Sequence, residues 1–321
     1  MKEQYLRILA AVFLGLVIPG FVMKLSAPAA EQRPLASGTS LSQNDEVRQS
    51  GVLVLMPDTG IQWMPLDEYV TGVILAEMPT TYDADALCAQ AVAARTYALK
   101  RQEGKRHSQG AVCSDPACCQ AFITITDFLN GLGYESDVSA AKTAAEATSG
   151  LVITYEEELI EATYFHSSGG RTEEAMAVWG VDLPYLTVVE SPGEEDLEDY
   201  MQRTFYSKKE LEMLLDRQLP GTPASWIGWT TYTVGGGIDK LLLAGVQYKG
   251  IELRSLLKLN STVLSIQPDS DGLWITAWGK GHRVGMSQTG AQAMALRGYT
   301  WQEILAHYYP GTRIDKMEEV G

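Results

Sequence analysis

One stretch of the sequence decides most about the fold: residues 66–101, which read LDEYVTGVILAEMPTTYDADALCAQAVAARTYALKR. It predicts a helix over about 66–76, because Pro65 suits a helix start and the acidic residues after it suit the positive end of the helix dipole. Pro79 ends this helix, since the residue before a proline is pushed out of helical geometry. A second helix is predicted over 84–103, with a face of small residues that permits close backbone approach.

Glu77 is the residue of this stretch with a candidate chemical role. It lies at the end of the first helix, among apolar residues that run from Val73 to Met78. Such surroundings destabilise the charged form of a carboxyl group, so the pKa of Glu77 is expected to rise toward that of a general acid at neutral pH. The alternative is an ordinary surface glutamate at a helix terminus.

Around these two helices, alternating apolar runs and turn residues predict further elements. The predicted strands lie at 51–56, 61–64, 151–155 and 159–165, the last two as a hairpin, with four more runs between 230 and 278. Further helices are predicted near 138–148, over 208–217, near Gly290 and after Thr300, two of them from capping boxes. Helices and strands come in blocks rather than in strict alternation, so the predicted class is α+β, with mixed helices and antiparallel sheet around one catalytic cleft.

Composition excludes some classes of function. The chain of 321 residues carries 40 acidic and 25 basic residues, a formal net charge of −15. A nucleic-acid binder needs a basic face, so nucleic acid is not an expected partner. The length allows one large domain or two modest ones.

The N-terminus predicts a membrane or export signal. Residues 8–23 carry no charge, and Lys2 and Arg7 precede them. The run is short for a bilayer span of about 20 residues, a deficit that snorkelling of the flanking basic residues offsets. Basic residues before the run favour an N-terminus inside and the bulk of the chain outside. Residues 26–50 predict a flexible linker, and a signal peptidase site at 27–29 is the alternative to an uncut anchor.

A cluster of metal-ligating residues follows the second helix. His107, Cys113, Cys118 and Cys119 lie within thirteen residues, as H-x5-C-x4-C-C. Three thiolates and one imidazole suit tetrahedral zinc, and four protein ligands leave no open position, so such a zinc is structural. The alternatives are a disulfide of Cys113 with Cys118 or Cys119, and free thiols. No organic cofactor is expected.

Four ordered motifs carry a family resemblance. They are E-M-P at 77–79 with A-Q-A-V-A-A-R-T-Y-A after it, and the segments 164–192, 250–262 and 279–312. Together they resemble the stage II sporulation protein D family of peptidoglycan lytic transglycosylases. The resemblance implies an uncut membrane anchor over 1–25, a linker over 26–50 and an extracytoplasmic catalytic domain over 51–315. It also raises the expectation of zinc, because the family includes members with a Cys/His site in this loop.

The resemblance further implies the reaction and its setting. Glu77 would protonate the oxygen between N-acetylmuramic acid and N-acetylglucosamine, and would then take the proton of the muramic 6-hydroxyl as this closes a 1,6-anhydro ring. The place implied is the cell membrane between mother cell and forespore during engulfment in sporulation. The partners implied are peptidoglycan glycan strands, a sporulation amidase/endopeptidase and a membrane scaffold protein.

Polar residues of the motifs are candidate substrate contacts. They are Arg95, His166, Ser167, Ser168, Arg171, His282, Ser287 and Gln288. Arg95 has a second interpretation, as a buried helix partner for an acid, and His166 has one as the histidine of a tight turn. Arg283 stands where the family pattern G-H-G-V-G-M-S-Q has glycine. If that position needs positive φ, Arg283 costs about 1 kcal/mol or forces a different turn, and it adds a cation near the cleft.

Two other functions compete with the transglycosylase. A wall-binding enhancer of a partner amidase would have no turnover and would tolerate Glu77→Gln. A zinc-dependent hydrolase would lose its chemistry on chelation while keeping its fold, but the complete four-ligand set argues against it.

Overall fold

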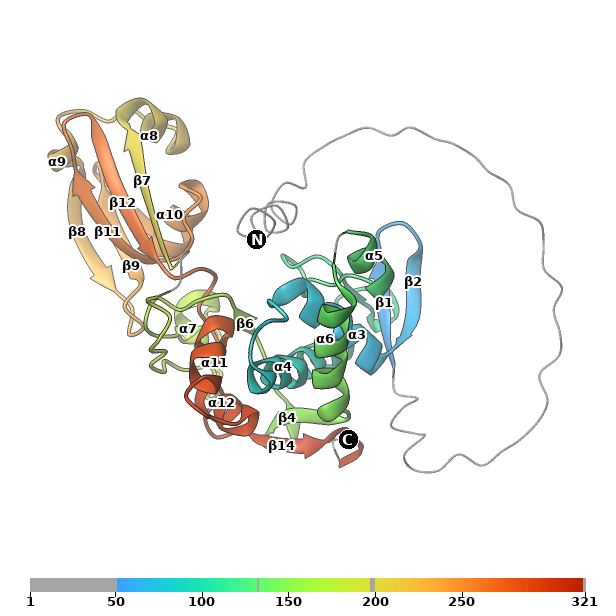
Figure 1. Ribbon diagram of the computed structural model, residues 1–321. Helices are drawn as coiled ribbons and strands as arrows, with labels where there is room; N and C mark the ends of the chain where they lie inside the picture. Colours follow the sequence, from blue (N-terminus) through green and yellow to red (C-terminus); the bar gives the residue numbers. More distant parts are fainter. Residues whose placement is uncertain (1–50, 132, 197–199, 320–321) are drawn as a thin grey trace, which may run out of the picture. The chain divides into compact units, whose positions relative to one another are not determined.

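The computed structural model describes residues 51–131, 133–196 and 200–319 (Figure 1). The predicted anchor at 1–25 and the linker at 26–50 lie outside these ranges. No helix within the described ranges is long and apolar enough to cross a membrane.

The first described element is a hairpin, and the helix that ends at Glu77 follows it directly. Strand β1 (Gly51–Met56) pairs antiparallel with β2 (Gly60–Pro65), and the short β3 (Val112–Cys113) joins β1 in parallel. Helix α3 (Leu66–Glu77) starts directly after β2, with Pro65 as its capping residue, and Met78 leaves it in an extended conformation. The predicted strand and helix boundaries are therefore confirmed here to within a residue or two.

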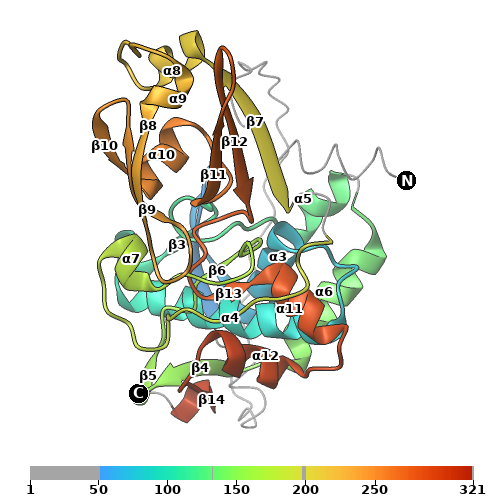
Figure 2. The same cartoon turned by 90° about the vertical axis from the view of Figure 1, so that its left-hand side faces the viewer.

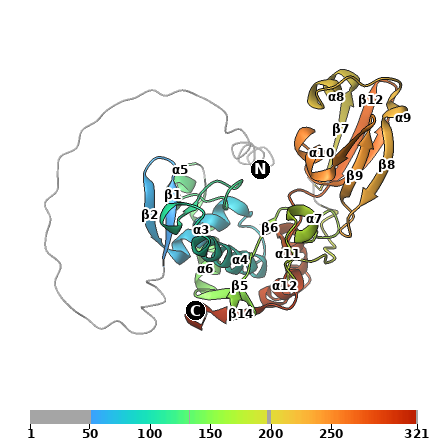
Figure 3. The ribbon, with the colours of Figure 1, turned by 180° about the vertical axis from the view of Figure 1, so that it is seen from behind.

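The described residues outside 201–278 are called the body below, and helix α4 (Ala84–Glu103) is its central element (Figure 3). Asp83 caps it by accepting a hydrogen bond from the Asp85 N–H at 3.0 Å. Every residue from 86 to 98 is buried, so the helix is covered on all sides and not only on the predicted face of small residues. It contacts α3, β1, β4 (Leu151–Tyr155), α6 (Glu135–Ala147), α11 (Gln288–Ala295) and α12 (Trp301–Tyr308). Alanine side chains permit this because they let several helix backbones approach one another.

The predicted hairpin of 151–155 and 159–165 is wrong in its second strand. β4 lies between β14 (Arg313–Lys316) and β5, and β5 has only the residues Glu158–Leu159. β6 (Tyr164–Phe165) instead pairs in parallel with β13 (Met286–Ser287). Ile160 and Ala162, both fully buried, enter the core between the two strands, and this draws the chain off the sheet edge. The remaining short elements are η1 (Ser108–Gly110), α5 (Ile125–Asn130), α7 (Ala175–Trp179) and η2 (Met317–Glu319).

Residues 201–278 form a lobe with two antiparallel sheets, called the inserted lobe below (Figure 2). One sheet has the order β10-β9-β8 and the other β11-β12-β7. Its strands are β7 (Met201–Ser207), β8 (Ile227–Tyr232), β9 (Ile238–Leu243), β10 (Val246–Lys249), β11 (Val263–Pro268) and β12 (Gly272–Trp278). Its helices are α8 (Lys208–Leu214), α9 (Pro223–Trp226) and α10 (Gly250–Leu256).

The inserted lobe has its own hydrophobic core, around side chains such as Trp226, Leu253 and Leu273. The capping box of Ser207 with Glu210 opens α8 as predicted. The apolar run 241–248 is two strands rather than one, because Ala244 and Gly245 take positive φ and turn the chain. The α+β class with antiparallel sheets is confirmed, and the two short parallel pairings were not predicted.

Candidate functional site

Glu77 lies at the meeting point of three segments. It is the last residue of α3, and its Oε1 accepts a hydrogen bond from the Ala121 N–H at 2.8 Å. The side chain of Gln288, the first residue of α11, lies near enough to favour the charged form of Glu77. Burial raises the pKa of Glu77, and the Ala121 N–H and the Gln288 side chain partly oppose this rise. A carboxyl group held in this way is suited to donating and then recovering a proton.

A buried glutamine on α4 supports this arrangement. Gln90 is fully buried, and its Oε1 lies 3.5 Å from Nε2 of Gln288, the outer limit of a hydrogen bond. Its own Nε2 is buried without a hydrogen-bond partner. The sequence reasoning did not single out Gln90, although a glutamine between the alanines of a central helix is a signal that could have identified it.

A chain of hydrogen bonds runs from Tyr164, whose pKa the Glu77 charge affects, through Gln120 to Tyr69 on α3. The Tyr164 hydroxyl donates to Oε1 of Gln120 at 2.7 Å, and Nε2 of Gln120 donates to the Tyr69 hydroxyl at 3.0 Å. Burial raises the pKa of Tyr164, and the negative charge of Glu77 adds to this effect. Tyr164 therefore stays neutral beside Glu77 and holds the segment around Gln120 in place.

The four predicted metal ligands come together. The candidate ligand atoms of His107, Cys113, Cys118 and Cys119 all lie within 4.8 Å of one another. Nε2 of His107 is 3.3 Å from Sγ of Cys118 and 3.5 Å from Sγ of Cys119. A tetrahedral zinc with Zn–S bonds of about 2.3 Å separates its sulfurs by roughly 3.8 Å, so the donor set fits that ion.

The chemistry of the donors agrees with this fit. All four cysteines of the chain are unbridged, and Cys88 lies apart in the core. Burial raises the pKa of the Cys113 thiol to about 12, so it stays a neutral thiol at physiological pH unless a cation beside it, such as a zinc ion, stabilises the thiolate. The cluster also leads directly to the carboxyl group, because Cys119 precedes by two residues the Ala121 N–H that binds Glu77.

The glycine-rich turn after β6 is held by an acid that the sequence reasoning missed. Glu194 is fully buried, and its Oε2 accepts from the Ser168 N–H at 2.7 Å and the Ser168 hydroxyl at 2.8 Å. Its Oε1 accepts from the hydroxyls of Ser191 at 2.8 Å and Ser287 at 2.5 Å. Ser168 and Ser287, predicted as substrate contacts, are thus buried and bind the protein itself. Nothing in the acidic segment around Glu194 distinguished it from its exposed neighbours.

Comparison with known proteins identifies the family. Residues 58–155 match the family model described as stage II sporulation protein. Over 264 residues the chain is 33% identical to the stage II sporulation protein D of Bacillus subtilis (strain 168), and the match spans 80% of this chain and 76% of that protein. The chain belongs to the stage II sporulation protein D family. The protein of the same name from Bacillus amyloliquefaciens is also 33% identical over 264 residues, with the same coverage of both chains. A lower identity, 27% over 302 residues, relates the chain to the amidase enhancer of Bacillus subtilis (strain 168), with 76% of this chain and 40% of that protein covered.

Arg283, the departure from the glycine pattern of the stage II sporulation protein D family, is a buried link between segments. It takes φ of +69°, so the position does need the left-handed conformation. Its guanidinium is 1% exposed and lies 3.7 Å from the Glu173 carboxylate. It donates to the backbone carbonyls of Ser168 at 2.7 Å and Gly235 at 2.5 Å. The cation therefore stabilises the protein and is not presented to solvent, unlike the expected cation near the cleft.

Two other predicted arginines are engaged as well. Arg95 is fully buried on α4, pairs with Asp67 at 3.0 Å and donates to the carbonyl of Ala145 at 3.0 Å. Arg95 is therefore a buried helix residue that pairs with an acid, and no part of its side chain is exposed to a glycan. Arg171 is more than half exposed and pairs with Glu190 at 2.5 Å.

The two histidines of the motifs differ in their surroundings. His282 accepts from the Val284 N–H at its Nδ1, at 3.1 Å, and packs against the rings of Phe165 and Trp179. Burial lowers the pKa of His282 to about 4, so it is neutral at physiological pH. His166 is half-buried in the turn, and its backbone carbonyl accepts from the Thr289 N–H. Ser167 beside it is fully buried, with a hydroxyl that has no hydrogen-bond partner.

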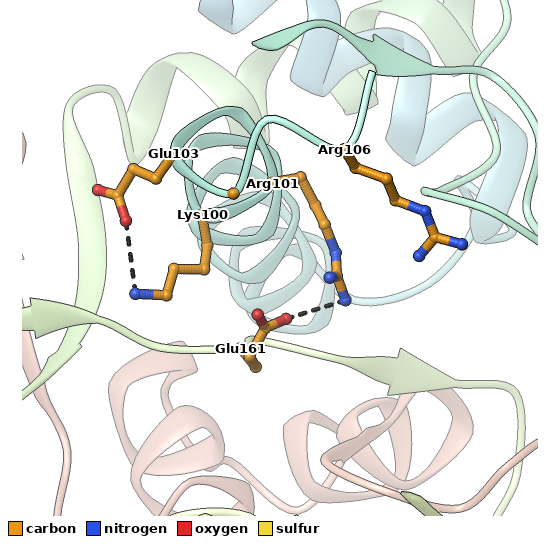
Figure 4. Close-up of a pocket in the computed structure, with 6 residues that line it drawn as sticks. Lys100, Arg101, Glu103, Arg106 and Glu161 are labelled. Carbon is orange, nitrogen blue, oxygen red and sulfur yellow. Dashed lines mark ion pairs between the residues drawn. The ribbon is translucent and has the colours of Figure 1, made fainter. Parts of the chain in front are cut away.

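A surface pocket at the C-terminal end of α4 is separate from the predicted site residues (Figure 4). It is lined by Lys100, Arg101, Glu103, Gly104, Arg106 and Glu161. Ion pairs of Lys100 with Glu103 at 3.4 Å and of Arg101 with Glu161 at 2.9 Å neutralise two of its three cations. Its charge is therefore nearly balanced.

Proposed function

We propose that this chain is a membrane-anchored lytic transglycosylase that cleaves peptidoglycan glycan strands between N-acetylmuramic acid and N-acetylglucosamine. The observation that supports this most is the setting of Glu77: burial raises its pKa, while the Ala121 N–H binds its carboxylate and the nearby Gln288 side chain favours its charged form. Membership of the stage II sporulation protein D family places the proposal in sporulation.

One carboxyl group is enough for this reaction. Glu77 gives its proton to the bridging oxygen as the C1–O bond breaks, and the muramic 6-hydroxyl adds to C1. The proton of that hydroxyl returns to Glu77, so no water enters and the product has a 1,6-anhydro end. Between the two proton transfers Glu77 is charged, and the Ala121 N–H and Gln288 stabilise it then.

The described surroundings of Glu77 agree with this route. Glycosidases with two carboxyl groups place them about 5–10 Å apart, and at that distance each charge raises the pKa of the other. Among the described residues, no second carboxylate contributes to the pKa shift of Glu77.

The cofactor, the location and the partners belong to the same proposal. His107, Cys113, Cys118 and Cys119 would hold a structural zinc that fixes the loop carrying Ala121. The apolar segment 8–23 would anchor the chain in the membrane, with the described body outside it, between mother cell and forespore. Similarity to an amidase enhancer supports a sporulation amidase as a partner.

The decisive test is digestion of purified glycan strands by the full-length chain, wild type beside Glu77→Gln, with products analysed by mass spectrometry. We expect products about 18 Da lighter than hydrolysis products, one water less per cleavage, and their loss in the variant. Hydrated ends would instead indicate a hydrolase with a second carboxylate.

A second candidate is a wall-binding enhancer of an amidase, favoured by the relative of that name. It predicts no cleavage of intact or peptide-stripped strands by the wild type. It also predicts that Glu77→Gln stimulates a partner amidase as well as the wild type does.

A further inference from the structure

Glu194 is a buried carboxylate in the described body that the proposed mechanism does not use. It is fully buried and accepts hydrogen bonds from five donors. Three reach Oε2, from the Ser168 N–H and hydroxyl and from the Gly169 N–H at 3.2 Å. Two reach Oε1, from the hydroxyls of Ser191 and Ser287. A carboxylate offers acceptors alone, so it satisfies this set in a way that a neutral amide, with its own two N–H groups, does not.

One of these donors leads directly to Glu77. The Ser287 hydroxyl donates to Oε1 of Glu194 at 2.5 Å and accepts from the Gly290 N–H at 3.1 Å, which caps α11. The next residue, Gln288, is the first of α11; its Nε2 lies 3.5 Å from Oε1 of Gln90 on α4, and its side chain favours the charged form of Glu77. Because Gln288 follows Ser287 directly, the bonds that fix Ser287 also fix the backbone position from which the Gln288 side chain extends.

We propose that Glu194 is a positioning residue for the active site: it holds Ser287, and through it the start of α11, so that the Gln288 side chain lies beside the Glu77 carboxylate. This inference rests on the proposed role of Glu77 and extends it to a residue 117 positions further along the chain. Glu194 itself has no contact with Glu77 among its hydrogen bonds, so it acts through Ser287 and Gln288.

The same turn is held from its opposite side. Nε of Arg283 donates to the Ser168 carbonyl at 2.7 Å, while Glu194 binds the Ser168 N–H. The Glu194 charge raises the pKa values of three titratable groups beside it, Arg283, Tyr200 and Tyr308. Glu194 is thus fixed by partners on three separate segments of the chain, as a residue that positions others must be.

The two ends of Glu194 allow a matched pair of variants. Ser287→Ala removes a hydroxyl that donates to Oε1 and accepts from the Gly290 N–H. Ser168→Ala removes a hydroxyl that donates to Oε2 and accepts from the Gly170 N–H at 3.0 Å. Each variant leaves the carboxylate four donors, but Ser287→Ala alone breaks the connection toward Gln288.

The test is the titration of Glu77 by NMR, in full-length protein labelled with 13C at glutamate carboxyl groups. The signal of Glu77 is the one that Glu77→Gln removes. Because the Gln288 side chain favours the charged form, its loss raises the pKa of Glu77. Tyr164 is a titratable group whose pKa the Glu77 charge raises, and none of these variants replaces it.

We expect Gln288→Ala, Ser287→Ala and Glu194→Gln each to raise the pKa of Glu77, and Ser168→Ala to leave it unchanged. Ser287→Ala combined with Gln288→Ala should shift it no further than Gln288→Ala alone, since both act on one contact. The inference is overturned if folded Ser287→Ala has the wild-type pKa of Glu77, if Ser168→Ala raises it equally, or if Gln288→Ala has no effect. The serine pair decides the matter even where Glu194→Gln fails to fold.

The titration needs no turnover. A wild type that cleaves no glycan would overturn the proposed function while the positioning of Glu77 by Glu194 would still be measured. In an active wild type, the same variants should move the high-pH limb of the cleavage rate to higher pH, since Glu77 must be protonated to act.

Discussion

Several polar side chains that the motifs present as candidate contacts bind the protein itself. Ser168, Ser287 and Arg283 form one buried group around Glu194 and the turn after β6. Arg95 forms another with Asp67. Buried polar groups need partners, and a site that holds a carboxyl group at a raised pKa needs rigid walls. Family motifs of this kind therefore describe the support of a site as much as its contacts.

Glu77→Gln is predicted to stabilise the fold at neutral pH. Burial raises the pKa of Glu77 above its unfolded value, so the folded state pays for ionising it. Below the pKa of Glu77 in the unfolded state, near pH 4, this penalty is absent. It grows as the pH rises from the unfolded-state pKa to the folded-state pKa, and above the folded-state pKa it is complete. The denaturant midpoint of Glu77→Gln should exceed that of the wild type at about pH 8, and the gap should close near pH 4.

The exposed Glu68 on the same helix is the control. Its charge lies at the positive end of the helix dipole, so Glu68→Gln should lower the midpoint slightly or leave it unchanged. Equal midpoints of wild type and Glu77→Gln at both pH values would show that the carboxyl group is not penalised in the folded state.

At the scale of elements, the loop between α4 and α5 joins the cluster of His107 and three cysteines to the Glu77 carboxyl group. The Asp115 carbonyl accepts from the N–H groups of Cys118 and Cys119, which shapes the turn that brings the thiols together. The chain then passes through Gln120, which is bound by Tyr164, to the Ala121 N–H at Glu77. A metal ion that fixed Cys118 and Cys119 would therefore also fix the position of the Ala121 N–H, which donates to Glu77.

Removal of the proposed zinc is predicted to lower the stability of the fold, and to lower activity only as a result of that. We expect a chelator, or Cys113→Ala, to release about one zinc per chain and to lower Tm by roughly 5–10 °C, because the bound ion stabilises only the folded state. Metal content and calorimetry of the same samples measure both effects.

Cys88→Ala is the matched control, since Cys88 is buried in the core and outside the cluster. It should keep its zinc. Loss of glycan cleavage on chelation with Tm unchanged would instead support a catalytic zinc.

At the scale of the whole molecule, a buried ion pair attaches the inserted lobe to the body. Glu173 and Arg283 belong to the body, and both contact Gly235 of the lobe. Glu173 also accepts a hydrogen bond from the Thr233 hydroxyl. A Cβ at Gly235 would lie 2.4 Å from the Thr172 carbonyl oxygen, so only glycine permits this approach. The lobe has its own core, and these polar contacts supplement its covalent connections to the body.

Arg283→Gly, which restores the family's residue, is predicted to destabilise this chain. Breaking a buried ion pair costs about 3–5 kcal/mol, and relief of the positive φ returns about 1 kcal/mol. The net loss of unfolding free energy should be about 2–4 kcal/mol in denaturant titrations, with faster hydrogen exchange at the Gly235 amide.

Adding Glu173→Gln to Arg283→Gly should recover part of the loss, because it removes the unpaired buried charge. If Arg283→Gly alone is as stable as the wild type, the remaining contacts are enough to attach the inserted lobe to the body.

Local signals were enough to predict many of the elements. Proline, capping residues and apolar periodicity placed β1, α3, α4 and the capping boxes of α8 and α12 close to their observed bounds. They succeeded because helix ends and turns depend on residues a few positions apart. The raised pKa of Glu77 and the gathering of His107, Cys113, Cys118 and Cys119 were also predicted, since apolar neighbours and short spacing are visible in the sequence, while their roles stay predictions.

Partners far apart in the sequence were decided by the tertiary structure. The pairing of β6 with β13, the burial of α4 on all sides and the bonds of Glu194 join segments separated by tens to more than a hundred residues. No local pattern tells whether Ser287 faces a glycan or a carboxylate. That depends on which element packs against it, because a buried hydroxyl binds whatever acceptor the fold brings within reach.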